Sequence, residues 1–178
     1  MSMHTGPLDH NNNQKNEHDW ENVYRETLPK IFHFFCYRVG DKFVAEDLTS
    51  LTFEKAWAGR ERFRNDTGSF IQWLFGIARN VVVDHFRNAN SEIPITQDIL
   101  ETDQHSPEIS LQRNSDYSRL TILLAQLSER DRELVSLKYG AELTNRTIAR
   151  LTGLSETNVG TILFRVVRKL RAEWEADQ

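Results

Sequence analysis

A helix-turn-helix spacing near the C-terminus is the feature that most limits what this chain can fold into. The segment TIARLTGLSETNVGTILFRVVRKLR, residues 147–171, places Ala149, Gly153 and Val159 four and six residues apart. The small Ala149 lets two helices approach, Gly153 can adopt the positive φ of the turn, and Val159 can pack the second helix on the first. Ser155 is a suitable N-cap for that second helix. The spacing predicts a helix-turn-helix, and the basic charge around it indicates DNA binding.

The second helix of this motif has one apolar face and one polar face. At about 100° per residue, the apolar side chains fall on one stripe that consists of Val159, Ile162, Leu163, Val166, Val167 and Leu170. The opposite face carries Thr157, Asn158, Gly160, Thr161, Phe164, Arg165 and Arg168. The ring of Phe164 either contacts a thymine methyl group in the major groove or packs against a neighbouring helix. Arg165 and Arg168 are expected to contact phosphates, the more frequent class of protein–DNA contact.

Charge is distributed unevenly along the chain, although the formal net charge is only −4. Residues 88–117 contain one Arg against six acidic residues, whereas residues 140–171 contain six basic residues against two acidic ones. The acidic stretch also carries Pro94, Pro107 and only isolated Ile and Leu residues, which favours a tether over a packed element. A chain of 178 residues can form two small domains. We therefore expect a first domain at 20–87, a linker at 88–115 and a second domain at 116–173.

Both domains show helical periodicity, and no strand-like alternation competes with it. The expected helices span residues 20–38, 43–60, 69–88, 116–126, 129–139, 144–152 and 156–173. Ser128 and Asp131 form a candidate capping box. The predicted fold class is all-α, with two small helical domains joined by a flexible acidic linker. Residues 1–19 are rich in Asn and His and have no signal-peptide pattern, so we expect a disordered leader there.

The helix expected at 69–88 combines large rings with polar side chains. Its apolar side chains cover a broad arc that consists of Phe70, Ile71, Leu74, Phe75, Ala78, Val81, Val82 and Phe86. Trp73, Asn80 and Arg87 fall within about 40° of each other at the edge of that arc. Such a stripe suits unpaired bases, because the ring can stack on a base, the amide can contact its edge and the cation can bind phosphate. Trp73 fits equally well as a side chain that completes the core.

Several other functions do not fit the sequence. The longest apolar runs are far shorter than the about 20 residues that a membrane span needs, so we expect no membrane insertion and a cytoplasmic location. The His residues show no metal-site spacing and no Gly-rich phosphate loop is present, so we expect no enzyme, no catalytic residue, no metal and no cofactor. The single Cys36 lies in an apolar run, where it is expected to pack.

Four sequence motifs follow one another in a defined order. They are AEDL…F…AW within residues 45–57, RF…FIQWLFGIARNVVVDHFR within 62–87, LSERDRELVSL at 127–137, and the helix-turn-helix. In this order and spacing they resemble the extracytoplasmic-function (ECF) class of bacterial RNA polymerase sigma factors, over about residues 20–173. The resemblance implies a transcription initiation factor that binds the clamp of the largest subunit of core RNA polymerase. It further implies sigma region 2 at 20–87, which opens the minus-10 element, and region 4 at 116–173, which recognises the minus-35 element.

The resemblance also implies roles for individual residues. The clamp contact is assigned to Asp47, Leu48, Phe53 and Glu54. Binding of minus-10 DNA is assigned to the loop RFRNDTGSF, which holds a flipped base in the family, through Arg64, Asn65, Asp66 and Ser69. The stripe on the next helix, which the helical pattern indicates, adds Trp73, Asn80 and Arg87 to this binding surface. Base contacts in the minus-35 element are assigned to Glu156, Thr157, Gly160, Thr161 and Phe164. Arg165 and Arg168, which the helical pattern places on the same face, are added as phosphate contacts. The chain departs from the family at Ser50 and Leu51, where an amide and an acid are usual, and at Gly160, where Lys or Arg is common.

A second class of function remains open: a two-domain helix-turn-helix transcriptional regulator that acts on promoter DNA without core polymerase. The resemblance also makes an anti-sigma factor a candidate partner. Fully extended at about 3.3 Å per residue, a linker of about 30 residues reaches about 100 Å, enough to span two promoter elements more than one helical turn apart. Because the net charge is −4, we predict that the free chain binds promoter DNA weakly.

Overall fold

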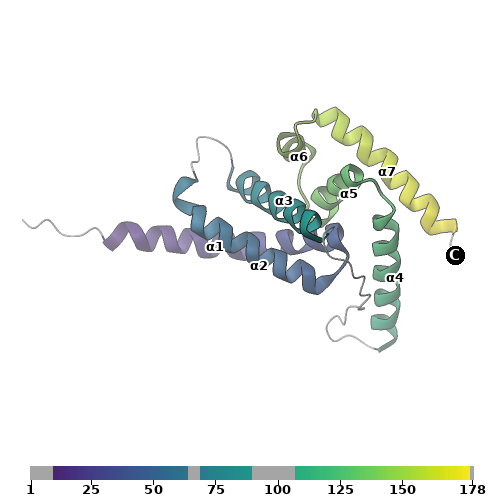
Figure 1. The fold of residues 1–178 in the computed structure, drawn as a ribbon, viewed down its shortest axis with the longest axis horizontal. Coiled ribbons are helices and arrows are strands. Elements are labelled where there is room, and N and C mark those ends of the chain that lie inside the picture. The colour runs from purple at the N-terminus through teal and green to yellow at the C-terminus, as the bar shows by residue number, and fades with distance from the viewer. Residues whose placement is uncertain (1–9, 64–68, 90–106, 177–178) are drawn as a thin grey trace, which may run out of the picture.

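The computed structural model describes residues 10–63, 69–89 and 107–176, which form two helical bundles (Figure 1). The N-terminal bundle contains α1 (His10–Val39), α2 (Lys42–Gly59), the 3-10 turn η1 (Arg60–Arg62) and α3 (Phe70–Ala89). The C-terminal bundle contains α4 (Pro107–Ala125), α5 (Glu129–Val135), the π-helical turn η2 (Ser136–Gly140), α6 (Asn145–Thr152) and α7 (Glu156–Ala176). These described residues contain no strand, and their helical architecture confirms the all-α prediction.

Local capping groups set the helix boundaries of the helix-turn-helix and of the helix before it. Ser128, Thr144 and Ser155 each accept a hydrogen bond from the backbone N–H three residues later, at 3.1, 3.2 and 3.1 Å. These bonds pair N–H groups that would otherwise lack a partner at the start of α5, α6 and α7. Gly153 ends α6 with a φ of 73°, a conformation that L side chains rarely adopt. The predicted cap at Ser155 and the predicted positive φ of Gly153 are therefore confirmed.

Some helix boundaries differ from those expected from the sequence. α1 begins at His10, inside the segment 1–19 that was expected to be disordered, and α4 begins at Pro107, inside the expected linker 88–115. A helix that is already nucleated by packed residues extends through polar residues at little cost, which periodicity does not reveal. Pro is also well suited to the first turn of a helix, because its missing N–H would be unpaired there. The helix expected at 129–139 divides into α5 and η2.

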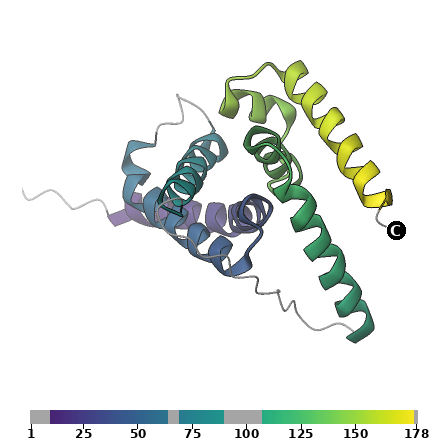
Figure 2. The same ribbon diagram turned by 45° about the vertical axis from the view of Figure 1, so that its right-hand side comes forward.

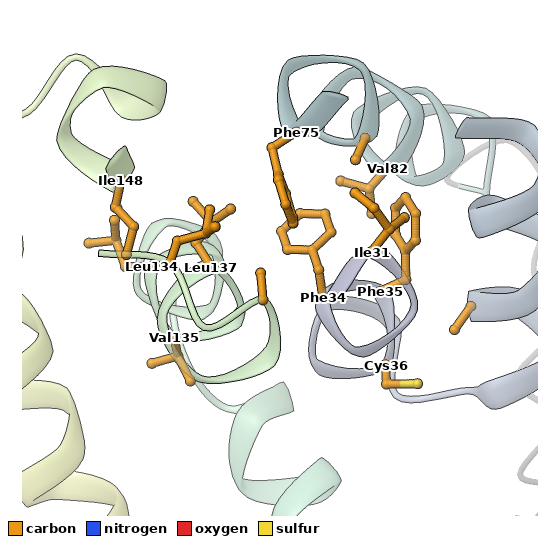
Figure 3. Close-up of a cluster of buried hydrophobic side chains, with 14 of the residues drawn as sticks. Ile31, Phe34, Phe35, Cys36, Phe75, Val82, Leu134, Val135, Leu137 and Ile148 are labelled. Atoms are coloured by element: carbon orange, nitrogen blue, oxygen red, sulfur yellow. The ribbon is translucent and has the colours of Figure 1, made fainter. Parts of the chain in front are cut away.

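One buried core joins the two bundles, which lie face to face in both views (Figures 1 and 2). On the N-terminal side, the rings of Phe34 and Phe75 meet edge to face with centroids 5.7 Å apart. On the C-terminal side, Leu134, Leu137 and Ile148 are fully buried, and Figure 3 shows them opposite the two rings. Burying a side chain of this size stabilises the fold by about 1.5–3 kcal/mol. The core therefore sets the position of α5, η2 and α6 against α1 and α3.

Candidate nucleic-acid interface

Helix α7 is anchored by its apolar stripe and exposes its polar face. Val159, Ile162, Leu163 and Val166 are buried, while Val167 and Leu170 are half-buried. α7 packs on α5 and α6, so the stripe fixes the rotation of the helix about its own axis. The polar face that the sequence predicted therefore points away from the bundle.

Phe164 is the most exposed large apolar side chain on this face, at 66% of its surface. The Arg168 guanidinium lies over its ring, 5.7 Å from the centroid. An exposed ring next to a cation is not packed against a neighbouring helix, so that alternative does not hold in this structure. Thr157 and Thr161, on the same face, are also exposed. Gly160 is half-buried, and a Cβ atom there would lie 3.5 Å from Asn145 Nδ2.

Two ion pairs hold charged side chains of α7 at the surface. Arg165 Nη2 lies 3.2 Å from Asp131 Oδ1, and Arg146 Nε lies 3.6 Å from Glu156 Oε2. The side chains of Arg165 and Arg146 are 68% and 73% exposed. Ion pairs this exposed contribute only about 0–1 kcal/mol. Either arginine can therefore exchange its carboxylate partner for a phosphate at little cost.

The stripe at the edge of α3 is partly open to solvent. Asn80 and Arg87 are exposed, and Arg87 Nη2 donates to Asp84 Oδ1 at 2.8 Å. Ser69 is exposed just before the helix, and its Oγ accepts a hydrogen bond from the Gln72 N–H at 3.4 Å. The remaining loop residues assigned to the minus-10 element, Arg64, Asn65 and Asp66, lie outside the described residues.

Trp73 is half-buried, which fits both a side chain that stacks on a base and a side chain that completes the core. Its ring centroid lies 5.3 Å from that of Phe63 and 5.4 Å from that of Phe70. A Cβ atom on Gly59 would touch the Trp73 ring at 3.4 Å. One side of the indole therefore completes an aromatic cluster, while the rest of its surface remains accessible. The cluster gives the ring a fixed orientation, which a stacking surface needs.

A third exposed surface runs along α2. Asp47 and Glu54 are exposed and seven residues apart, whereas Leu48 and Phe53 are only 6% and 8% exposed. The side chains on the outer side of this helix, which we call the α2 outer stripe, are Phe43, Asp47, Ser50, Leu51 and Glu54. The stripe combines two carboxylates with two exposed apolar side chains, a pattern typical of a protein-binding surface.

Comparison with known proteins identifies the family to which this chain belongs. Residues 23–92 match the family model of Sigma-70 region 2, and residues 118–170 match that of Sigma-70, region 4. The ECF RNA polymerase sigma factor SigC of Mycobacterium tuberculosis is 30% identical over 153 residues, which cover 83% of this chain and 77% of SigC. This chain belongs to the ECF family of RNA polymerase sigma factors. As a sigma factor, it directs RNA polymerase to promoters for transcription initiation.

Two further comparisons agree with this assignment. The ECF sigma factor BldN of Streptomyces coelicolor is 32% identical over 151 residues, covering 83% of this chain, which spans 57% of the length of BldN. The sigma factor RpoE from a complex with the anti-sigma factor NepR of Bartonella quintana superposes with a TM-score of 0.72 at 23% identity, over 90% of this chain and 99% of RpoE. The structural likeness supports the helical fold of this ECF sigma factor.

The described residues of this sigma factor also exclude some features. None of its helices in the described ranges is long and apolar enough to cross a membrane. Within the same ranges, no group of three or more His, Cys, Asp or Glu side chains is placed to hold a metal ion. Cys36 is buried at 8% exposure, which confirms that it packs in the core.

Two arginines of this sigma factor hold the bundles together and were not singled out in the sequence. Arg38 is only 2% exposed, and Arg79 contacts both α5 and the end of α6. Arg38 follows Ile31, Phe34 and Phe35 at helical spacing, so its position on an apolar stripe is a signal that could have identified it. Arg79 carries no such signal, because its partners come from a distant part of the chain.

Proposed function

We propose that the outer face of α7 recognises the minus-35 element of the promoter as duplex DNA. The observation that carries this proposal is the 66% exposure of Phe164 on a helix whose opposite stripe is buried. Its ring can contact a thymine methyl group in the major groove, with Thr157 and Thr161 beside it on base edges. Glu156 and Gly160 complete the contact face, and Arg165 and Arg168 contact phosphates. Because Gly160 offers no long cation, the base preference of this factor differs from that of relatives with Lys or Arg there.

We further propose that α3 and the loop before it act on the opened minus-10 element. Trp73 stacks on an unpaired base, Asn80 contacts a base edge and Arg87 contacts phosphate, while Arg64, Asn65, Asp66 and Ser69 hold a flipped base. Opening duplex costs about 1.4 kcal/mol per base-pair step, whereas stacking one base on an aromatic ring yields about 1–3 kcal/mol. The stacking of one or two captured bases offsets only the cost of opening the first base-pair steps. The factor therefore nucleates the bubble, and core polymerase maintains the rest.

The α2 outer stripe is the surface that we propose binds the clamp of core RNA polymerase. Exposed Asp47 and Glu54 make the direct contact, while Leu48 and Phe53 support the stripe from the core. Leu51 is 39% exposed where the family usually carries an acid, so this factor replaces a charged contact with an apolar one. The factor therefore works in the cytoplasm, where core polymerase acts, and an anti-sigma factor is a further partner class that competes for its surfaces.

Transcription in vitro with purified core polymerase tests the roles proposed for these three surfaces. A library of promoter fragments should yield transcripts only when both the sigma factor and core enzyme are present. Asp47→Arg with Glu54→Arg should reduce core binding about a hundredfold, because the loss of two charged contacts at about 1.5 kcal/mol each amounts to about 3 kcal/mol. Glu26→Arg, a charge reversal at an exposed position on α1, is the matched control and should have little effect. Sequence-specific operator binding by the isolated chain without core enzyme would instead favour the regulator.

A further inference from the structure

An exposed ring and a cation lie together at the C-terminal end of α2. The Trp57 side chain is 43% exposed, and the Arg60 guanidinium lies over its ring, 4.0 Å from the centroid. Arg60 Nη1 also donates to the carbonyl oxygen of Trp57 at 2.8 Å, which holds the guanidinium at the end of the helix. Neither residue is among those that we assign to DNA or to the clamp. We call this pair the Trp57–Arg60 stack.

A series of ring contacts connects the Trp57–Arg60 stack to Trp73. The Trp20 ring lies 5.5 Å from the Trp57 ring and 5.4 Å from the Phe70 ring, between centroids. The Phe70 ring in turn lies 5.4 Å from the Trp73 ring. The neighbouring rings fix the orientation of Trp57 as they fix that of Trp73, which a stacking surface needs.

The backbone at the end of α2 also lies against Trp73. A Cβ atom at Gly59, which stands between Trp57 and Arg60 in the sequence, would lie 3.4 Å from the Trp73 indole. α2 ends and α3 begins at the same end of the N-terminal bundle (Figure 1). The Trp57–Arg60 stack is therefore continuous with the surface that we propose contacts the opened minus-10 element.

The charge of α2 changes sign shortly before the Trp57–Arg60 stack. Residues 43–54, which include the α2 outer stripe, contain three acidic residues and no basic one. Residues 55–62 contain three basic residues and one acidic one. Acidic side chains repel phosphates, whereas a cation beside an exposed ring attracts single-stranded nucleic acid. The end of α2 therefore fits nucleic acid better than it fits an extension of the clamp contact.

We propose that the Trp57–Arg60 stack is a second stacking site for an unpaired base, on the same promoter strand that Trp73 contacts. The inference rests on the proposed function, because a base can reach this stack only where the minus-10 element is already open. The base stacks on the open part of the indole or on the guanidinium plane, and the guanidinium also attracts a neighbouring phosphate. The partner is single-stranded DNA, since a base inside a duplex does not expose its face.

A second stacking site changes how region 2 holds the opened strand. Stacking of one base contributes about as much free energy as opening one base-pair step costs. Two stacking sites fixed on one edge of the bundle keep two bases of the same strand from pairing again. The lifetime of the open complex should therefore depend on both rings.

The test measures the lifetime of the open complex that core polymerase and the sigma factor form on promoters with one abasic site in the unpaired strand. An abasic site removes one base and keeps its phosphate. With the wild-type factor, the lifetime should fall about fivefold to 150-fold when the base on the Trp57–Arg60 stack is missing. Trp57→Ala should cause the same fall on the intact promoter, and that abasic site should then cause no further loss, because the ring and the base act as one pair.

Three further variants control this measurement. Tyr139→Ala removes a ring of similar exposure, 49%, from η2 in the other bundle and should leave the lifetime unchanged. Trp57→Phe keeps a ring beside Trp20 and should restore part of the lifetime. Arg60→Ala removes the guanidinium from an exposed position and should shorten the lifetime without changing the melting temperature. Thermal melting checks that every variant is folded.

Two results would overturn the second stacking site. One is that every abasic site has the same effect with Trp57→Ala as with the wild type. The other is that Trp57→Ala weakens binding to core polymerase and leaves the response to every abasic site unchanged, which would assign Trp57 to the clamp contact. Trp73→Ala on the same promoters tests the proposed function separately. If Trp73→Ala abolishes the effect of one abasic site and Trp57→Ala abolishes none, the minus-10 surface stands without the Trp57–Arg60 stack.

Discussion

The two bundles are organised by different kinds of interaction. In the C-terminal bundle, three helices begin at Ser128, Thr144 and Ser155 caps and α6 ends at a left-handed Gly153, so local hydrogen bonds and backbone conformation set the helix ends. In the N-terminal bundle, the helices are positioned by ring packing, as between Trp20 and Phe70, whose ring centroids lie 5.4 Å apart. Asp41, which caps α2, is a local signal within that bundle. A bundle whose helix ends are set by local caps should lose little stability when one capping group is removed. A bundle held by ring packing should lose much more stability when a single buried ring is removed.

Phe75→Ala should produce the largest loss of stability among the changes that test this contrast. Phe75 is fully buried in α3 and packs edge to face on Phe34. Truncating a buried Phe costs about 3–5 kcal/mol, from lost burial and the cavity left behind. Chemical denaturation of the full chain measures the free energy of unfolding. Val83→Ala, on the same helix at 50% exposure, is the control and should change it by less than about 0.5 kcal/mol. If Phe75→Ala and Val83→Ala lost equal amounts of unfolding free energy, the N-terminal bundle would not depend on its buried rings in the way described.

Trp73→Ala should have an intermediate effect, and on function more than on stability. Its half-buried ring should contribute the about 1–3 kcal/mol of one stacked base to the open complex, while closed-complex binding changes little. Open-complex lifetime on duplex promoter measures the loss, and thermal melting of the variant measures any change in folding. A large drop in melting temperature, with no rescue by a template whose minus-10 element is already unpaired, would make Trp73 a core residue alone.

Ser155→Ala should have the smallest effect, about 1 kcal/mol of unfolding free energy, because it removes one side-chain cap from α7. The Ser155 Oγ accepts from the Asn158 N–H at 3.1 Å, and α7 keeps its buried stripe without that bond. Ser155→Asp restores an acceptor at the same position and should recover most of the lost stability. If Ser155→Ala lost as much unfolding free energy as Phe75→Ala, the C-terminal bundle would depend on single groups as strongly as the N-terminal bundle does.

The same contrast explains how much of the structure could be predicted. The helix-turn-helix follows from local signals, and Gly153, Ser155 and Val159 occupy the conformations and burial that their spacing predicts. Exposure of Phe164 resolved an alternative that helix periodicity left open. The contacts of Arg79 could not be predicted, since Glu133 and Leu151 are brought to it by tertiary packing.

The π-helical turn η2 was also beyond the reach of sequence periodicity. Residues 136–139 lie within the helix expected at 129–139, and the π-helical turn that they form with Gly140 packs against α1. Gly140 directly follows the helix expected at 129–139, and in the structure it lies against the α1 backbone, where a Cβ atom would come within 2.8 Å of the carbonyl oxygen of His33. Glycines of this kind are recognised only when the opposite backbone is known.

The most direct test of the central claim is the base preference of Phe164→Ala at the minus-35 element. Core polymerase with wild-type or variant sigma factor is assayed on promoters that differ at single minus-35 positions, both as duplex and with a pre-melted minus-10 bubble. The account predicts that the variant loses about 1–3 kcal/mol of preference at one base pair, and that the bubble does not restore it. An unchanged minus-35 preference, or one restored by the bubble, would contradict recognition of duplex DNA by α7.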